Sequence, residues 1–172
     1  MAHSFSLQLA TPRLLLVPMT YDFARRILAG DTGAYIDHGI TPTSGWPNAD
    51  TLKILPVIRD NLAKPTARPG FESWLFLHGG TLAPVGDGGF KEPPNDYGVI
   101  ELGYGILENE RHKGYCSEAT AALVKWGLLQ PGVNEIIADC LEDNLASQKI
   151  LQKLGMRQYS HKNGLLFYRL VG

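Results

Sequence analysis

The stretch Asn109–Ala119, NERHKGYCSEA, places two basic residues, a histidine and a glycine directly before the start of an expected helix. An apolar segment over 99–107, VIELGYGIL, predicts a strand before it, and SEATAALVKWGLL over 117–129 predicts the helix after it. Backbone N–H groups in such a loop and first helical turn lack intrahelical acceptors, and the helix dipole adds partial positive charge. Arg111 and Lys113 add full charges, so the stretch is suited to binding a phosphate or pyrophosphate group.

Gly114 has a specific part in this hypothesis, because a residue without a Cβ lets phosphate oxygens approach the backbone amides closely. The simpler interpretation gives Gly114 only a turn, with Arg111 and Lys113 as solvated surface charges. The stretch matches neither the GxxxxGK[ST] phosphate loop nor the GxGxxG dinucleotide fingerprint. Taken alone, it leaves both interpretations open.

A second polar helix start lies further along the chain. Asn144 and Ser147 begin the expected helix 143–155, DNLASQKILQKLG, immediately after the expected strand 134–142, NEIIADCLE. Asn144 by itself indicates an ordinary N-cap. If the strands 99–107 and 134–142 are parallel neighbours, their carboxyl ends lie side by side, and both polar helix starts meet at one edge of the sheet.

The whole pattern predicts a single mixed α/β domain over residues 1–172, with the order β α α β β β α β α β β. Pro56 should kink or shorten the helix in which it lies. The further expected elements are a strand over 11–19, a helix over 21–29 capped by Thr20, a loop over 31–48, a helix from near Asn48 to Leu62, a strand over 72–80, a strand between two turns over 79–90, and a hairpin over 157–172 with its turn at Asn163-Gly164.

Composition excludes several classes of protein. The chain has 172 residues, 44% of them hydrophobic and 19% charged, which is typical of a soluble globular domain. A net charge of -1 argues against a nucleic-acid partner, and no apolar run approaches the roughly 20 residues of a membrane span. Cys116 and Cys140 form no CxxC pair and the five histidines form no HxxxH or HExxH pattern, so no metal site is expected. The segment MAHSFSLQLA lacks the pattern of a secretion signal, so a cytoplasmic location is expected.

Three segments together resemble the GCN5-related N-acetyltransferase (GNAT) family: LGYGI at 102–106, ERHKGYCSEA at 110–119 and EDNLASQKILQKLGM at 142–156. Within that family the sequence is most similar to the branch of the ribosomal-protein N-terminal acetyltransferases. TPRLLL at 11–16 and PVGDGGF at 84–90 also match this branch, so the resemblance covers nearly the whole chain.

The family motifs fall on particular residues of this chain. The pyrophosphate motif Arg/Gln-x-x-Gly-x-Gly/Ala falls on Arg111, Gly114 and Cys116, where the cysteine departs from the usual glycine or alanine but is still small. His112 replaces a glycine that is common at its place in the branch. The Asn-x-x-Ser element falls on Asn144 and Ser147.

The resemblance implies a mixed, mostly antiparallel central sheet with a splayed parallel strand pair, 99–107 and 134–142, flanked by about four helices. It also implies that acetyl-CoA lies in the gap of that pair as the cosubstrate, with its pantetheine arm along strand backbone. The cofactor-binding residues implied in this way are Ile106, Leu107, Arg111, His112, Lys113, Gly114, Tyr115, Cys116 and Asn144.

The implied reaction is direct attack of a primary amine on the thioester. Glu101 is the candidate base, directly or through a water, and Ser147 is the candidate proton donor to the sulfur. A strand N–H at Ile106 or Leu107 would serve the oxyanion. Glu101 is equally well interpreted as a solvated edge charge or a partner for an arginine. Cys116 should have a lowered pKa at a helix start, but direct transfer leaves it no nucleophilic role.

The acceptor would lie across the gap, walled by the first two helices, the C-terminal hairpin, and the loop around Tyr35, Asp37, His38 and Trp46. No dense acidic cluster occurs in these walls, which disfavours a strongly polycationic acceptor. A protein N-terminus and a small amine both remain open, as do a monomer and a homodimer. The competing functions are a non-catalytic acyl-CoA sensor on the same fold and, less favoured, a nucleotide- or NAD-binding protein that uses the same phosphate site.

Overall fold

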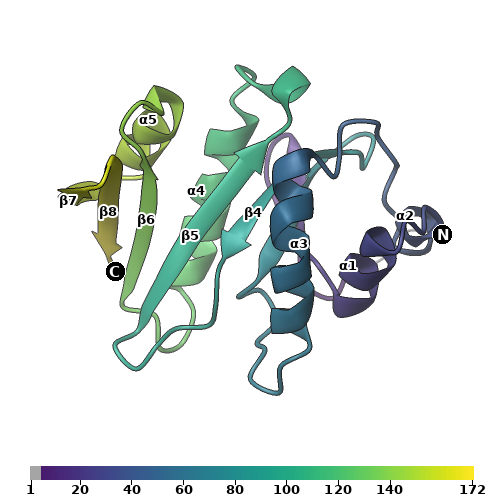
Figure 1. The fold of residues 1–172 in the computed structure, drawn as a ribbon, viewed down its shortest axis with the longest axis horizontal. Coiled ribbons are helices and arrows are strands. Elements are labelled where there is room, and N and C mark those ends of the chain that lie inside the picture. The colour runs from purple at the N-terminus through teal and green to yellow at the C-terminus, as the bar shows by residue number, and fades with distance from the viewer. Residues whose placement is uncertain (1–4) are drawn as a thin grey trace.

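A computed structural model describes residues 5–172 as one eight-stranded sheet with helices on both faces (Figure 1). The strands lie in the order β1-β2-β3-β4-β5-β6-β8-β7. The elements are β1 Leu9–Ala10, β2 Leu14–Pro18, α1 Tyr21–Leu28, α2 Gly33–Asp37, α3 Ala49–Leu62, β3 Ser73–His78, β4 Pro84–Phe90, β5 Val99–Ile106, a 3-10 turn η1 Glu108–Glu110, α4 Tyr115–Leu128, β6 Glu135–Leu141, α5 Leu145–Lys153, β7 Arg157–Lys162 and β8 Leu165–Val171.

Two hydrophobic cores hold the layers together, one on each face of the sheet. On one face, α1 and α3 pack onto the strands through residues such as Phe23, Trp46 and Leu55. On the other face, α4 and α5 pack through residues such as Leu123 and Leu151. In Figure 1, α3 lies in front of the sheet and α4 behind it. The sheet is therefore buried on both faces, and open space is confined to places where strands or helices separate.

Local sequence signals account for most element boundaries. The side chains of Thr20, Asn48 and Asn144 accept hydrogen bonds from backbone N–H groups in the first turns of α1, α3 and α5. At the hairpin turn, Asn163 and Gly164 have φ angles of 53° and 76°, as a two-residue turn with two left-handed residues requires. The caps predicted at Thr20 and Asn144 and the predicted hairpin turn are confirmed, and the second helix starts where expected, with Asn48 as its cap.

Three expectations about elements were wrong. The segment 31–48 is not all loop, because it contains the short helix α2. Of the two effects expected of Pro56, shortening is wrong, because α3 continues to Leu62 with Leu55 and Ile58 buried on either side of the proline. The second turn expected in 79–90 is a straight continuation of β4 to Phe90.

The glycines that suggested a turn in β4 serve close packing instead. A Cβ at Gly86 or Gly88 would collide with the backbone of β5, and one at Gly89 would collide with the carbonyl of Glu72. Glycine therefore lets the backbones of neighbouring strands approach closely here, which is one of the reasons that glycine occurs inside strands.

The parallel pair β5 and β6 opens as expected. The strands pair only from Val99 opposite Glu135 to Glu101 opposite Ile137. Beyond this point β5 pairs with β4 alone and β6 pairs with β8 alone, and the two ribbons diverge in Figure 1. The predicted fold, a mostly antiparallel sheet with one splayed parallel pair, is confirmed.

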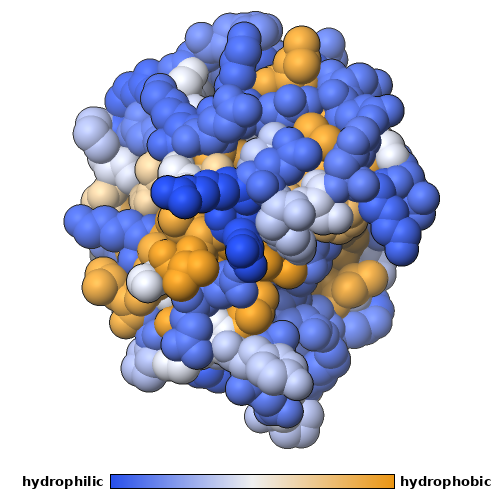
Figure 2. Space-filling view, turned by 90° about the vertical axis from the view of Figure 1, so that its left-hand side faces the viewer, coloured by the Kyte–Doolittle hydropathy of each residue, from blue (hydrophilic) through white to orange (hydrophobic). Residues whose placement is uncertain are grey.

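Figure 2 looks onto the end of the molecule that carries the β7–β8 hairpin, where hydrophilic residues surround a hydrophobic area. Exposed hydrophobic side chains at this end include Leu141, Leu145 and Val171. No helix within residues 5–172 combines the length and the apolar character that crossing a membrane requires.

Candidate functional site

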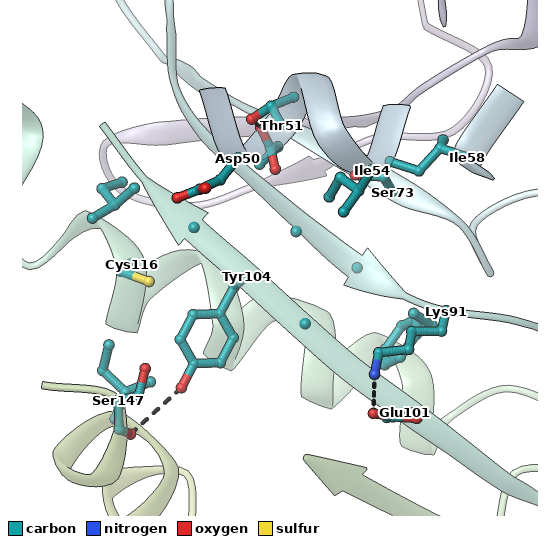
Figure 3. Close-up of a pocket in the computed structure, with 18 of the residues that line it drawn as sticks. Asp50, Thr51, Ile54, Ile58, Ser73, Lys91, Glu101, Tyr104, Cys116 and Ser147 are labelled. Carbon is teal, nitrogen blue, oxygen red and sulfur yellow. Dashed lines mark hydrogen bonds and ion pairs between the residues drawn. The ribbon is translucent and has the colours of Figure 1, made fainter. Parts of the chain in front are cut away.

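One large cleft, with a volume of about 1410 Å³, follows β5 and is lined by residues from both faces of the sheet. In Figure 3, Asp50, Thr51, Ile54 and Ile58 of α3 lie on one side of β5. Tyr104, Cys116 and Ser147 lie on the other side, toward the starts of α4 and α5. Single ligand sites usually measure about 300 to 1,000 Å³, so this cleft has room for two molecules.

The loop before α4 presents backbone donors to the cleft. Gly114 is the N-cap of α4 with φ 80°, and His112 has φ 63°. The first α-helical hydrogen bond of α4 runs from the Glu118 N–H to the Gly114 carbonyl, so the three N–H groups of 115–117 have no intrahelical acceptor. His112 stands at the position where the sequence comparison noted a common glycine, and its left-handed backbone costs about 1 kcal/mol.

Arg13, about 100 residues earlier in the sequence, holds this loop in place. This residue was not identified from the sequence. Its guanidinium donates to the Lys113 carbonyl at 2.7 Å and to a Glu118 carboxylate oxygen at 2.7 Å, and lies 4.8 Å from the centre of the Tyr115 ring. Burial would raise the pKa of Glu118, but hydrogen bonds from Thr11 and Arg13 together hold that pKa below its usual value. The only feature of the sequence that pointed to Arg13 was the resemblance of TPRLLL at 11–16 to the family branch, and that resemblance assigned no role to Arg13.

Two of the predicted cofactor residues do not line the cleft. Lys113 pairs its ammonium group with Glu110 at 2.8 Å. Leu107 is buried, its N–H donates to the Val85 carbonyl at 2.9 Å, and its carbonyl accepts from the Glu110 N–H at 2.9 Å. The nine other predicted site residues line the cleft: Glu101, Ile106, Arg111, His112, Gly114, Tyr115, Cys116, Asn144 and Ser147.

The strand ladder decides which N–H groups of β5 are available. Backbone hydrogen bonds link Leu107 to Val85 and Lys91 to Glu101, so the odd-numbered residues of β5 face β4. Successive N–H groups in a strand point to opposite edges, so the N–H of Ile106 points toward β6. Because β6 has separated there, that N–H faces the gap between the two strands.

The start of α5 brings two hydroxyl groups close to one another. The Asn144 side-chain oxygen accepts the Ser147 N–H at 3.1 Å, which leaves the amide nitrogen of Asn144 as a donor. The Tyr104 hydroxyl donates to the Ser147 carbonyl at 3.4 Å, and burial raises the pKa of Tyr104 well above its usual value. Tyr104 thus places a protonated hydroxyl in the cleft beside Ser147 (Figure 3).

Cys116 lies on the same side of β5 as Tyr104 and Ser147, and its thiol is unreactive. Burial raises the pKa of its thiol to about 12, which reverses the lowering expected at a helix start. The physical reason is that the thiol is desolvated without any neighbouring cation to stabilise its thiolate. At neutral pH Cys116 is therefore a small neutral side chain.

Glu101 lies on the other face of β5, where its carboxylate pairs with the Lys91 ammonium group (Figure 3). Its partner is thus a lysine, where the sequence alternative named an arginine. Gly103 and Gly105 follow on the same face, and a Cβ at either would meet no atom within 4 Å. These glycines leave an open floor along β5 between Glu101 and the end of the strand.

The wall opposite Glu101 differs from the expected one. Tyr35 and Trp46 are buried between α1 and the sheet, and the Tyr35 hydroxyl donates to the Trp46 carbonyl at 3.0 Å. Asp37 pairs with Arg26 at 2.8 Å. Among residues 5–172, α1, the segment 31–47 and the hairpin 157–172 do not line the cleft, and aromatic packing draws the segment 31–47 into the core. Of the expected walls, only the second predicted helix, α3, lines it. The described residues also contain no group of three or more histidine, cysteine, aspartate or glutamate side chains arranged for a metal ion.

Comparison with known proteins gives a consistent picture. A family model described as an acetyltransferase (GNAT) domain matches residues 13–157. The "Uncharacterized N-acetyltransferase YjdG" of Bacillus subtilis (strain 168) is 36% identical over 147 residues, which cover 86% of this chain and 88% of that protein.

Two solved structures share the fold at low sequence identity. The ribosomal-protein-S5-alanine acetyltransferase of Vibrio fischeri has a TM-score of 0.65 at 12% identity, covering 96% of this chain and 97% of that one. The microcin C7 self-immunity acetyltransferase MccE, in complex with acetyl-CoA and AMP, has a TM-score of 0.62 at 14% identity, covering 94% of each chain.

Proposed function

The chain belongs to the GNAT acetyltransferase family, and from that premise we propose that it transfers an acetyl group from acetyl-CoA to a primary amine. The observation that carries the proposal is the opening between β5 and β6 beyond Glu101 and Ile137, which lies between the start of α4, without a side-chain cap, and the start of α5, capped by Asn144. Such an opening exposes strand backbone to a ligand between two sets of polar groups.

The residues of the opening fit acetyl-CoA. The N–H groups of 115–117 and the Arg111 guanidinium would bind the pyrophosphate, because a helix start with a cation beside it favours a divalent anion. The side-chain amide of Asn144 would bind the pantetheine, whose arm would lie along the backbone of β5. Leu107 and Lys113 would support this loop from behind without contact to the ligand.

The chemistry then divides between the two faces of β5. Glu101 takes a proton from the attacking ammonium, and the neutral amine forms a C–N bond with the thioester carbon as the C–S bond breaks. The Ile106 N–H would stabilise the oxyanion. The leaving sulfur takes a proton from Ser147, or from Tyr104, whose raised pKa keeps its hydroxyl protonated at neutral pH. The second proton lost by the amine nitrogen then returns to that hydroxyl through solvent, and Glu101 releases its proton to solvent.

Calorimetric titration of acetyl-CoA tests the proposal. We expect saturable binding to the wild type and its loss in Gly114→Glu, because a carboxylate and a strained left-handed backbone would both enter the phosphate loop. Gly30→Glu is the matched control: Gly30 also has a left-handed backbone, with φ 74°, and a Cβ there meets no atom within 4 Å. At a hundred times its dissociation constant, acetyl-CoA should stabilise the fold by about 2.7 kcal/mol in a melting experiment.

Release of free thiol from acetyl-CoA, measured with a panel of amines and N-terminal peptides, then identifies the acceptor. Failure of the wild type to bind acetyl-CoA would overturn the proposal. Binding without thiol release for any acceptor would favour the acyl-CoA sensor instead.

A further inference from the structure

A buried carboxylate lies in the cleft without a cation to balance it. Asp87 of β4 is 7% exposed, and one of its oxygens accepts hydrogen bonds from the Trp46 indole N–H and the Thr51 hydroxyl, both at 2.7 Å. Both donors are neutral, and within residues 5–172 no lysine, arginine or histidine forms an ion pair with Asp87. Because no cation compensates this buried carboxyl group, burial raises the pKa of Asp87 against the hydrogen bonds from Thr51 and Trp46, and a cationic ligand would favour its charged form.

Asp87 faces the half of the cleft in which the amine would react. It lies directly opposite Gly105 in the strand register, on the face covered by α3, and it lines the same cleft as Glu101. Because Gly103 and Gly105 carry no Cβ, no side chain of β5 separates Asp87 from the floor that leads to Glu101. A ligand lying on that floor would therefore reach both carboxylates.

The surroundings of Asp87 are acidic and partly apolar. Five carboxyl groups line this half of the cleft, those of Asp50, Glu72, Asp87, Glu92 and Glu101. Lys91 is the one lysine or arginine among the described residues that lines the same half, and it is already paired with Glu101. Ile54 and Val57 of α3 expose hydrophobic side chains to the cleft. Asp50 belongs to α3, a wall that the sequence predicted, whereas the other four carboxylates lie between residues 72 and 101, outside the predicted walls. An acidic cluster was therefore not expected at this site.

Resting on the proposed function, we propose that the acceptor is a linear aliphatic amine with a second, protonated amino group, and that Asp87 is the specificity-determining residue that binds this ammonium. One amino group reacts beside Glu101, the methylene chain lies against Ile54 and Val57, and the other amino group stays charged. That ammonium group donates a charge-assisted hydrogen bond to Asp87 and is the cation that balances the carboxylate. Affinity for such an acceptor depends on the charge of Asp87, whereas a purely structural Asp87 would need only its hydrogen bonds to Trp46 and Thr51.

The variant Asp87→Asn separates these two roles, because an amide oxygen still accepts from Trp46 and Thr51 while the charge is lost. The probes are linear diamines with three to six methylene groups and amino alcohols of the same lengths, titrated by calorimetry into protein saturated with coenzyme A. We expect the best diamine to bind the wild type at least about tenfold more tightly than its matched amino alcohol, as a charged hydrogen bond provides. In Asp87→Asn this ratio should fall below about twofold.

Two controls define the result. Asp50→Asn removes an exposed carboxylate of the same cleft, already paired with Lys53, and should keep the wild-type ratio. Thr51→Val removes one hydrogen bond to Asp87 but keeps its charge, and should keep the ratio as well.

Equal affinity of the wild type for both probe classes, the absence of any amine binding, or an unchanged ratio in Asp87→Asn would each overturn this inference. If Asp87→Asn does not fold, the comparison of diamines with amino alcohols on the wild type still tests the inference. If the inference about Asp87 is wrong, acetyl-CoA still binds, whereas if the proposed function is wrong, acetyl-CoA does not bind in the earlier titration.

Discussion

At the scale of single residues, the proposed chemistry depends on a carboxylate of β5 and a hydroxyl of α5. Glu101 is held by Lys91, which also lies 3.9 Å from a carboxylate oxygen of Asp139 on β6. Ser147 is held by its N–H at the capped start of α5. Glu101 and Tyr104 lie on opposite faces of β5, and Ser147 of α5 contacts Tyr104, so the carboxylate and the Ser147 hydroxyl approach a ligand in the gap from different directions.

Glu101→Gln and Ser147→Ala should each lower kcat by about a hundredfold or more, since each removes a proton-transfer group. The dissociation constant of acetyl-CoA should change by less than about threefold, because neither side chain supports the phosphate loop. Thiol release and calorimetry measure the two quantities. Asp139→Asn is the matched control, because Asp139 shares Lys91 but does not line the cleft. Full activity of Glu101→Gln would leave Glu101 as a solvated ion-pair partner.

At the scale of elements, the phosphate loop depends on a contact between the start of β2 and the start of α4. Arg13 holds the Lys113 carbonyl, the Glu118 carboxylate and the face of Tyr115 at once. A loop that contains two left-handed residues, His112 and Gly114, is conformationally costly and needs such support. Arg13 is thus a positioning residue for the cofactor site.

Arg13→Ala should raise the dissociation constant of acetyl-CoA by about tenfold, because the loop loses both its support and a nearby positive charge. S-acetylpantetheine, which lacks the pyrophosphate, distinguishes positioning from general damage: its kcat/KM should stay within about twofold of the wild type. Arg25→Ala, which breaks an exposed ion pair on α1, is the control. Equal losses for both acyl donors would show that Arg13 acts only on the stability of the fold.

At the scale of the whole molecule, the cleft places a carboxyl group in an environment that opposes its charge. Glu72, just before β3, is 3% exposed, and burial raises its pKa to about 7 against the attraction of Lys64 and a hydrogen bond with Asn61. In the unfolded chain the Glu72 carboxyl group has its ordinary pKa of 4.5. Below that pH the group is protonated in both states. As the pH rises to about 7 the unfolded state ionises first, so folding loses stability through this group.

Glu72→Gln should therefore melt at the same temperature as the wild type near pH 4.5 and several degrees higher at pH 8, a gain of at most about 3 kcal/mol. Melting curves across this pH range measure the difference. Asp60→Asn, at an exposed carboxylate on α3, should show no such trend. A difference between Glu72→Gln and wild type that is constant with pH would contradict the raised pKa.

The sequence by itself determined the local structure and the family. Thr20, Asn48 and Asn144 cap helices, and Asn163-Gly164 makes the hairpin turn, because each of these signals acts over about four residues of chain. The loop 111–116 was identifiable because its glycine, its charges and the start of α4 are contiguous. The family and the splayed sheet followed from such segments in the right order.

Only the tertiary structure decided the contacts between distant segments. Arg13 meets Glu118 across 105 positions of sequence, and Asp87 meets Trp46 and Thr51 across 41 and 36. The register of β4 against β5 turned Leu107 inward and left Ile106 at the gap. Burial raised the pKa of Cys116, where the helix start alone predicted a lower value. Each of these outcomes depends on which surfaces pack together and on how much water they exclude. Neither can be predicted from a short stretch of the chain.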